Sequence, residues 1–395
     1  MSEQAETVRY VVGTMTGTSI DGLDVALMRI TGRGLTMRAQ LVGFVAVGLG
    51  ALASPLRQLA EQQPLTAGEI CKLGADFAAL HIRAIGQVLT QSGVPRPDLI
   101  AIHGQTVFHQ PPLSWQFFCP ASVARAFDAP VVFDLRAADL AAGGQGAPIT
   151  PLADLVLFGA DYGPISIVNL GGFGNFTSLP ADGDAAAISG GDLCACNHVL
   201  DAVARAALGK VFDVDGAAAM AGVASASAMG ELAEMLGRQG ESGRSLGTGD
   251  EVASWAARTV AQAQGETPGE KGAGFGANLC AAACAAVAET IVKGMQQRGC
   301  GGRLALFGGG ARNAGLVREL HVRWPAKVLL GPELGMPVEA REAACMGVLG
   351  ALCQDGVAIT LPQVTLLPPG VPSPVAGLWA YPPRNDERPE ARGVN

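Results

Sequence analysis

The sequence has few aromatic residues and little charge of either sign. Phe, Trp and Tyr make up 5% of its 395 residues, and charged side chains make up 16%. The net charge is −8 and Lys and Arg form no cluster, so the positive surface that nucleic-acid phosphates require is missing. We therefore expect no nucleic-acid partner. A local glycine nest can still bind a phosphate group in an acidic protein.

The sequence also has no segment that we interpret as a signal peptide or a membrane span. Its first ten residues are polar, and the apolar stretch that follows is broken by Thr, Ser, Asp and Gly. Later apolar runs, such as residues 279–292, are rich in alanine and too short for a span. Nine cysteines, an odd number, indicate no disulfide framework. These features predict a cytoplasmic protein without a membrane partner.

The chain length favours two domains, because 395 residues exceed what one hydrophobic core usually supports. Each half opens with a glycine-containing hairpin and ends in strand–helix units, which predicts a duplicated α/β fold in two lobes. A single doubly wound sheet is the alternative, but parallel sheets do not begin with hairpins. We place the lobes at residues 1–160 and 161–375, followed by a flexible tail at 376–395.

Hydrophobic periodicity and turn residues predict the individual elements. In the first half we expect strands at 8–15, 23–30, 35–47, 98–103 and 130–134, and helices at 52–62 and 65–93. In the second half we expect strands at 164–172, 174–180, 185–189, 303–307 and 327–331. The helices expected there are 197–208, 217–236, 251–264, 277–297, 313–324 and 338–353.

The first hairpin loop, residues 13–24, is rich in glycine, hydroxyl groups and carboxylates. Its backbone N–H groups suit phosphate, and two carboxylates beside phosphate require a cation such as Mg²⁺ between them. Neither Rossmann nor P-loop spacing occurs in this loop, and a polar turn without a ligand is the alternative. We expect Gly17, Thr18, Ser19, Ile20, Asp21, Gly22, Leu23 and Asp24 to bind the nucleotide, with Asp21 and Asp24 at the metal.

Two further glycine clusters occur in the second half. Gly171 and Gly172 lie in the turn of the second hairpin, where they can contact the same phosphates. Gly308, Gly309 and Gly310 directly follow an apolar strand and precede a helix, which allows a flat ring or a phosphate to lie against the backbone. Each cluster is weak evidence by itself, and the three together favour a nucleotide site.

The densest polar stretch, residues 134–148, lies between the two hairpins. Asp134 ends a predicted strand, where ligand sites of α/β proteins form. Arg136 can pair with an anionic substrate or with Asp134, and Asp139 precedes a run of small residues around Gln145. A helix cap or a salt bridge is the alternative role for either aspartate.

Histidine and cysteine residues supply weaker candidates. His103 and Gln105 follow a predicted strand, and we expect them to hydrogen-bond a sugar; a buried, satisfied imidazole is the alternative for His103. His103 and His109 lack a third ligand for zinc. Cys194 and Cys196 have no matching second pair, which indicates buried thiols.

Asp192 is the candidate catalytic base. It follows the predicted strand at 185–189 and a Gly-Gly turn, and it precedes a helix that begins near Asn197. A carboxylate at such a strand end can accept a proton from an attacking hydroxyl group or water during phosphoryl transfer. An N-cap for the following helix is the alternative role.

Taken together, these segments resemble the anhydro-N-acetylmuramic acid kinase family. The matching segments, in the family's order between about residues 10 and 350, are GTMTGTSIDGLD, HGQTVFHQP, DLRAADLAAGGQGAPITP, NLGGFGN, FDVDGAAAMAG, FGGGARN and the Glu342-Ala-Ala stretch. The resemblance is nearly full length, and the pairing of GTSIDG with AAGGQGAP is specific to this family.

The resemblance implies a duplicated actin/hexokinase-like (ribonuclease H-like) α/β fold and a sugar kinase of peptidoglycan recycling. Such a kinase uses Mg-ATP and water to convert 1,6-anhydro-N-acetylmuramic acid into N-acetylmuramic acid 6-phosphate. The family's catalytic aspartate maps onto Asp192, with Asp139 as the second choice, and its ATP segment maps onto residues 17–24. Glu342 matches a glutamate associated with the sugar. The family also suggests a homodimer.

Three segments depart from the family pattern. The family's PKSTGRE segment is reduced to RSLGTGD at residues 244–250, and its closing NLPSVTGA segment is only echoed by ITLPQVTL at residues 359–366. The family's DxGPGN stretch is replaced here by Asp192-Leu-Cys-Ala-Cys-Asn197, which keeps only its two ends. This departure leaves two other interpretations open. One is a kinase of the same fold that acts on a different sugar, and the other is a nucleotide-binding protein without catalysis. The presence of Asp192 beside three glycine clusters argues against the second.

Overall fold

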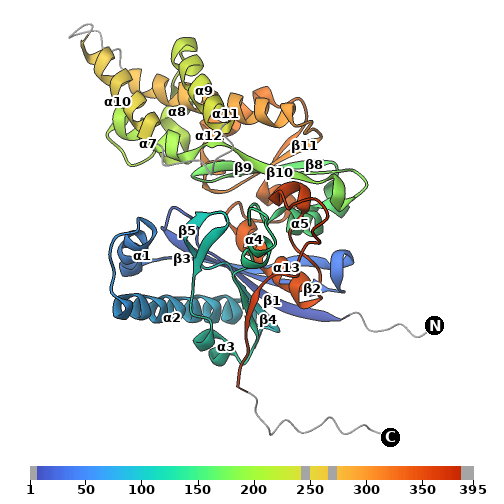
Figure 1. Ribbon diagram of the computed structural model, residues 1–395. Coiled ribbons are helices and arrows are strands. Elements are labelled where there is room, and N and C mark those ends of the chain that lie inside the picture. The colour runs from blue at the N-terminus through green and yellow to red at the C-terminus, as the bar shows by residue number, and fades with distance from the viewer. Residues whose placement is uncertain (1–6, 242–249, 266–273, 384–395) are drawn as a thin grey trace, which may run out of the picture. The chain divides into compact units, whose positions relative to one another are not determined.

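The computed structural model describes residues 7–241, 250–265 and 274–383, which divide into two units (Figure 1). Unit 1 comprises Met1–Gly143, Ala343–Ile359 and Pro374–Asn395, and unit 2 comprises Gly144–Glu342 and Thr360–Ser373. The division differs from the predicted lobes at 1–160 and 161–375, because two late segments of the chain return to unit 1.

Unit 1 is built on a six-stranded sheet with the order β13-β7-β4-β1-β2-β3. The first three strands, β1 (Val8–Met15), β2 (Gly22–Thr31) and β3 (Arg38–Gly48), form antiparallel pairs, as their alternating patterns and turns predict. Strands β4 (Leu99–Ile102) and β7 (Val131–Phe133) run parallel to β1. Strand β13 (Leu378–Ala380) pairs antiparallel with β7. The prediction of a flexible tail at 376–395 is therefore wrong for residues 378–380, which form β13. Residues 384–395 lie outside the described residues.

The two helices predicted at 52–62 and 65–93 are present as α1 (Ala53–Ala60) and α2 (Ala67–Ser92). Helix α2 begins with a capping box between Thr66 and Glu69 and ends at Gly93, whose φ is 66°. Its apolar face, which includes Phe77 and Val88, packs into a core that it shares with β1, β2 and β4. Two short helices, α3 (Ala121–Phe127) and α4 (Ala137–Ala141), and a hairpin of β5 (Gln105–Gln110) and β6 (Leu113–Phe117) complete this part of unit 1.

Helix α13 (Ala340–Gln354) crosses the division between the two units. In unit 1 it packs on β1 at Gly13, where a Cβ would lie 2.0 Å from the carbonyl oxygen of Ala343 and 2.3 Å from the backbone nitrogen of Gly347. A Cβ at Gly350 would lie 2.5 Å from the Cβ of Ala101 in β4. Small residues on both surfaces let the helix and the sheet approach closely, which explains why residues 343–359 join unit 1.

Unit 2 repeats the architecture of unit 1. Its sheet has the order β10-β9-β8-β11-β12, in which the first three strands in sequence pair antiparallel and the last two run parallel to β8. The strands are β8 (Ile165–Leu170), β9 (Phe173–Leu179), β10 (Ser189–Ala195), β11 (Arg303–Phe307) and β12 (Val328–Leu330). This recurrence confirms the duplicated actin/hexokinase-like α/β fold.

The third strand of unit 2 begins later than predicted. Residues 185–187 form a 3-10 turn, in which the Asp184 side chain accepts a hydrogen bond from the backbone N–H of Ala186, and β10 starts at Ser189. Three successive alanines have little preference for a strand, whereas aspartate favours a capped turn. The prediction of a strand at 185–189 is therefore wrong by several residues, and Asp192 lies within the strand and not after it.

The helices of unit 2 among the described residues are α5 (Pro151–Asp154), α6 (Ala160–Tyr162), α7 (Asn197–Leu208), α8 (Ala217–Ala221), α9 (Ala226–Glu241), α10 (Asp250–Gly265), α11 (Phe275–Gln297), α12 (Ala314–Arg323) and α14 (Pro362–Thr365). Helices α7 to α12 lie together on one side of the sheet of unit 2, and α5 lies on the other side (Figure 1). The single helix predicted at 217–236 is two helices, which part at Gly222, where a Cβ would lie 2.1 Å from the carbonyl oxygen of Ala277.

Helix α11 is the longest helix of unit 2 among the described residues and the most apolar. Its 23 residues extend beyond the predicted apolar run at 279–292 on both sides, and, by length and composition only, the helix is apolar enough to cross a membrane. Within the protein, 67% of its apolar window is buried, in a core cluster that also contains Val199 and Leu232. A buried helix of a protein core passes the same test of length and composition.

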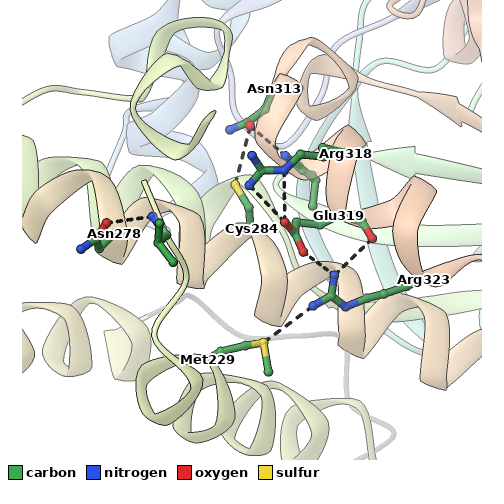
Figure 2. A network of polar contacts seen from close by, with 9 residues as sticks. Met229, Asn278, Cys284, Asn313, Arg318, Glu319 and Arg323 are labelled. Atoms are coloured by element: carbon green, nitrogen blue, oxygen red, sulfur yellow. Dashed lines mark hydrogen bonds and ion pairs between the residues drawn. The ribbon is translucent and has the colours of Figure 1, made fainter. Parts of the chain in front are cut away.

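Polar contacts hold α12 against α11 and α9, as Figure 2 shows. The Nε of Arg323 donates to Glu289 in α11 at 3.1 Å, and its Nη1 donates to Glu319. Asn313 caps α12 by accepting from the backbone N–H of Leu316 at 3.0 Å, and it also accepts from the Cys284 thiol at 3.6 Å. The Asn313 contacts fix the start of α12, which follows the third glycine cluster, and the Arg323 contacts hold its end.

Candidate nucleotide and sugar site

The turn between β1 and β2 is an ordered loop with an exposed polar tip. The carbonyl oxygen of Gly17 accepts a hydrogen bond from the backbone N–H of Ile20 at 3.2 Å, and the Ser19 hydroxyl donates to Asp21 at 2.8 Å. Arg57 in α1 donates to the carbonyl oxygen of Ile20 at 3.1 Å. Thr18, Ser19 and Asp21 are exposed. The turn is thus shaped by its own contacts, and its polar tip is accessible to a ligand.

Two glycines of this hairpin, Gly13 in β1 and Gly17 in the turn, serve different purposes. Gly13 is required by the protein itself, because α13 packs directly on its Cα. At Gly17, the nearest atom to an added Cβ is the Ser19 hydroxyl at 3.4 Å, an ordinary contact distance. Nothing in the described protein requires glycine at 17, which leaves its surface open for the close approach of a phosphate group.

Ile20 and Leu23 contribute their backbone to this loop, because their side chains belong to the core of unit 1. Ile20 is 4% exposed and Leu23 is fully buried. Ile20 has a φ of 52°, and a left-handed conformation costs a residue with a Cβ about 1–2 kcal/mol. Burial of the isoleucine side chain offsets this strain, which persists where surrounding structure imposes it and is frequent at ligand-binding turns.

Asp21 and Asp24 are the side chains predicted to hold a magnesium ion beside phosphate. Asp21 is exposed at the tip of the turn and Asp24 is half-buried in β2, opposite Met15. Among the described residues no group of three or more His, Cys, Asp or Glu side chains is arranged to hold a metal ion. A pair of carboxylates completed by water and substrate phosphate is the typical protein environment of Mg²⁺.

His103 and Gln105 are buried next to this turn. His103 is 3% exposed, and its Nδ1 lies 2.9 Å from the carbonyl oxygen of Gly104. Its Nε2 lies 3.0 Å from an Nη of Arg136, which can only donate, so Nε2 accepts and Nδ1 carries the proton. Burial, with a smaller contribution from the Arg136 charge, lowers the pKa of His103 to about 3. The imidazole is therefore neutral near pH 7.

The polar stretch after β7 begins in unit 1 and ends in unit 2. Asp134 has a φ of 47°, and burial raises its pKa against the opposing effect of hydrogen bonds from the backbone N–H groups of Ala137 and Arg136. Asp139 lies in α4 and is fully buried. Gln145 is exposed and belongs to unit 2, where its backbone N–H donates to the carbonyl oxygen of Thr365 at 2.7 Å.

The second glycine turn is hydrogen-bonded to the backbone at the start of α7. The carbonyl oxygen of Gly171 accepts from the backbone N–H of Asn197 at 3.0 Å, and that of Gly172 accepts from the backbone N–H of Cys196 at 2.8 Å. A Cβ at Gly172 would lie 2.5 Å from the His198 ring. Gly172 is therefore required by the packing of the helix, whereas the nearest contact at Gly171 is 3.3 Å.

The third glycine cluster lies against the second. A Cβ at Gly308 would lie 2.7 Å from the Asn169 side chain, and one at Gly310 would lie 2.7 Å from the Asn197 side chain. Between them, Gly309 has no neighbour closer than 3.9 Å to such a Cβ. The structure thus brings the two clusters together at the carboxyl ends of β8 and β11, and it leaves Gly309 open.

Asp192 is exposed in β10, an edge strand of unit 2. It lies opposite Asn175, and the register shifts between Asp192 and Cys194. Helix α7 has Cys196 at its N-cap, and the Cys196 side chain makes no capping hydrogen bond. The four residues from Leu193 to Cys196 are buried, and burial raises the pKa of Cys194 to about 12. Both cysteines are thus buried thiols, as predicted, beside an accessible carboxylate.

Glu342 lies in the first turn of α13 and is half-buried. Its neighbour Arg341 is 2% exposed and forms a buried ion pair with Asp154 of α5, in which the Arg341 Nε donates at 2.8 Å. Thr177 in β9 donates to the same carboxylate at 2.7 Å. Sequence reasoning missed this network, because neither Asp154 nor Arg341 lies in a glycine cluster or at a strand end.

Comparison with known proteins gives a consistent result along the chain. The family model described as anhydro-N-acetylmuramic acid kinase matches residues 9–367. Proteins of that name from Salinibacter ruber and Acidiphilium cryptum are each 32% identical to this chain; the first match covers 90% of this chain and 93% of the relative, and the second covers 93% and 97%.

Among solved structures, the chain is similar to the activator of the 2-hydroxyisocaproyl-CoA dehydratase from Clostridium difficile. That similarity has a TM-score of 0.47 at 13% identity and covers 88% of this chain and 95% of that chain. The family match spans both units and all three glycine clusters. The chain belongs to the anhydro-N-acetylmuramic acid kinase family.

Proposed function

We propose that this protein converts 1,6-anhydro-N-acetylmuramic acid, ATP and water into N-acetylmuramic acid 6-phosphate and ADP, as a cytoplasmic enzyme of peptidoglycan recycling. The observation that carries the proposal is the family match over residues 9–367. Membership of a kinase family supports ATP as the phosphoryl donor. The duplicated sheet, with a glycine turn after the first strand of each unit, supplies the matching architecture.

We assign the nucleotide phosphates to residues 17–24, Gly171, Gly172 and the cluster at Gly308, Gly309 and Gly310. Gly17 and Gly309 support this assignment best, because the protein's own packing does not require glycine at either position. Asp21 and Asp24 would hold Mg²⁺, which neutralises phosphate charge and orients the γ-phosphoryl group when bound. The exposed hydroxyl groups of Thr18 and Ser19 can donate to phosphate oxygens.

We assign the role of catalytic base to Asp192. Its carboxylate takes a proton from the water that attacks C1 of the sugar, and the bond between C1 and the bridging O6 breaks. The freed O6 accepts the γ-phosphoryl group, and ADP leaves. Asp192 is exposed, as a base that must reach water requires, whereas the second candidate, Asp139, is fully buried.

Arg136, Gln145 and Glu342 are the proposed sugar-binding residues. The muramic acid carboxylate is an anion, and the guanidinium of Arg136 is suited to bind such a group. Gln145 presents an exposed amide on the glycine-rich stretch. Glu342 can accept hydrogen bonds from sugar hydroxyl groups at the start of α13.

The test is a turnover assay in water enriched in oxygen-18. Purified protein with Mg-ATP and the anhydro sugar should release ADP and place the label at C1 of the product, with none in the phosphate. Label in inorganic phosphate would indicate ATP hydrolysis alone. ADP release with another sugar and none with the anhydro sugar would contradict the proposed substrate. We also propose a homodimer, which sedimentation equilibrium would detect.

A further inference from the structure

The segment His103-Gly104-Gln105 is bonded to the base of the first glycine turn. The Thr16 hydroxyl donates to the carbonyl oxygen of Gly104 at 3.0 Å, and this oxygen also accepts from Nδ1 of His103 at 2.9 Å. The Gln105 side-chain Nε2 donates to the carbonyl oxygen of Gly17 at 3.3 Å. Gly104 and Gln105, between β4 and β5, are therefore hydrogen-bonded to Thr16 and Gly17, the two residues that enter the turn.

The side-chain amide of Gln105 has only one workable orientation. Its Nε2 lies between two acceptors, the carbonyl oxygens of Gly17 and Thr106, at 3.3 and 3.2 Å. Reversal of the amide would place Oε1 against both oxygens, which repels. Gln105 is fully buried, and among the described residues no group donates to its Oε1. The orientation of the Gln105 side chain is thus set by the hydrogen bonds that its Nε2 donates, one of them to Gly17 in the turn.

His103 connects this turn to Arg136. Its Nε2 accepts from the guanidinium, and its Nδ1 donates toward Gly104, so both nitrogens are used within the protein. The uncharged imidazole of His103 is hydrogen-bonded to Arg136 on one side and to Gly104 on the other, so the positions of these two partners depend on each other. Direct hydrogen bonding of a sugar by His103, the expectation from sequence, would require one of these bonds to break.

We propose that His103 and Gln105 are positioning residues for the nucleotide turn, which act through Gly104 and Gly17 and do not bind the sugar. The proposal rests on the proposed function only in assigning the nucleotide to this turn. The bonds of His103 also link the turn to Arg136, so the position of the guanidinium and that of the phosphate-binding backbone are set together.

Two replacements of His103 separate its two bonds. In His103→Gln, the side-chain amide reaches the position of Nε2 and can still accept from Arg136, but the donor to Gly104 is lost. In His103→Asn, the amide overlies Nδ1 and can still donate to Gly104, but the acceptor for Arg136 is lost. Gln105→Met keeps the shape of the side chain and removes its donor to Gly17.

Affinity for Mg-ATP is measured by calorimetry without sugar, and KM for the anhydro sugar is measured by turnover. We expect His103→Gln and Gln105→Met to weaken Mg-ATP binding by about 5- to 10-fold, the loss of one hydrogen bond, with the sugar KM changed less than about two-fold. His103→Asn should retain nearly normal nucleotide affinity. The matched control is His81→Gln, which removes a comparable buried bond, from Nδ1 to the carbonyl oxygen of Phe77 at 2.9 Å, away from the turn.

In His103→Gln or Gln105→Met, a rise in the sugar KM of more than about ten-fold with unchanged Mg-ATP affinity would overturn the proposal, since it would make His103 and Gln105 sugar ligands. Normal values for both, or equal loss of Mg-ATP affinity in His81→Gln, would overturn it as well. Wild-type protein that binds Mg-ATP but does not turn over the anhydro sugar would refute the proposed function alone. Wild-type protein that binds no Mg-ATP would refute both.

Discussion

Replacement of Gly13 and of Gly17 by alanine should separate stability from nucleotide binding. At Gly13 the new methyl group would lie 2.0 Å from the carbonyl oxygen of Ala343 and 2.3 Å from the backbone nitrogen of Gly347. Both are main-chain atoms of α13, so no side chain can rotate away, and the helix must retreat by about 1 Å. At Gly17 the nearest atom is the Ser19 hydroxyl at 3.4 Å, and an alanine fits.

The expected sizes follow from these distances. Overpacking of a well-packed interior typically costs 1–3 kcal/mol, and an overlap with a helix backbone lies at the upper end, about 3 kcal/mol for Gly13→Ala. For a unit of this size such a loss lowers the unfolding midpoint by about 6–12 °C. Gly17→Ala should leave the midpoint within about 2 °C and weaken Mg-ATP binding at least about ten-fold, because its methyl group occupies space that a phosphate would use.

Circular dichroism during heating measures the first effect, and calorimetric titration with Mg-ATP measures the second. Wild-type stability in Gly13→Ala would refute the close packing of α13 on β1. Unchanged nucleotide affinity in Gly17→Ala would show that the open surface of this glycine does not contact phosphate. The two variants serve as controls for each other, since both add a single methyl group to the same hairpin.

Three further predictions concern the base, a buried ion pair and a buried histidine. Asp192→Asn should lower turnover at least about 100-fold, the contribution of a general base, with Mg-ATP affinity nearly unchanged; turnover within a few-fold of wild type would move the role to Asp139. Asp154→Asn should cost about 3–5 kcal/mol of unfolding free energy in urea, because it leaves Arg341 buried without its charge partner, whereas Asp154→Leu combined with Arg341→Met should recover most of that loss; equal losses in the single and double variants would contradict this account. Burial lowers the pKa of His81 to about 4, so the unfolded chain binds a proton below pH 6.5 that the folded chain does not. Stability should therefore fall by about 1.4 kcal/mol per pH unit from this residue as pH decreases from 6.5 toward 4, and urea unfolding at pH 7 and 5 should show a smaller difference for His81→Gln than for wild type.

The strand and helix pattern could be predicted wherever the signal is local. Strands β1, β2, β8, β9 and β11 are apolar runs that end in glycine-containing turns, and α2 shows a regular apolar face with caps at both ends. The hairpin of β5 and β6 was not predicted, because its turn contains two prolines and its strands are largely polar. Its importance comes from Gln105, whose partner Gly17 lies 88 positions away in sequence.

Contacts between distant segments explain the other differences. Residues 343–359 return to unit 1 because Gly347 and Gly350 match small residues on β1 and β4, and nothing local in the helix sequence indicates that partner. The polar start of β10, Ser189 to Asp192, is typical of a turn, and it becomes a strand only by pairing with β9. The sequence therefore identified Asp192 as a candidate but placed it at the wrong point of its strand.

Glycine clusters are an incomplete guide to ligand contacts, since most of these glycines are required by the fold itself. Because Gly13 has no Cβ, α13 can pack against it, and Gly172 leaves room for the His198 ring in the same way. Gly308 and Gly310 leave room for the side chains of Asn169 and Asn197, respectively. Clustering identifies only the region where backbone and side chains pack closely. The positions most suited to phosphate are those where glycine relieves no internal contact. Gly17 meets that condition in unit 1, where it follows β1, and Gly309 meets it in unit 2, where it follows β11.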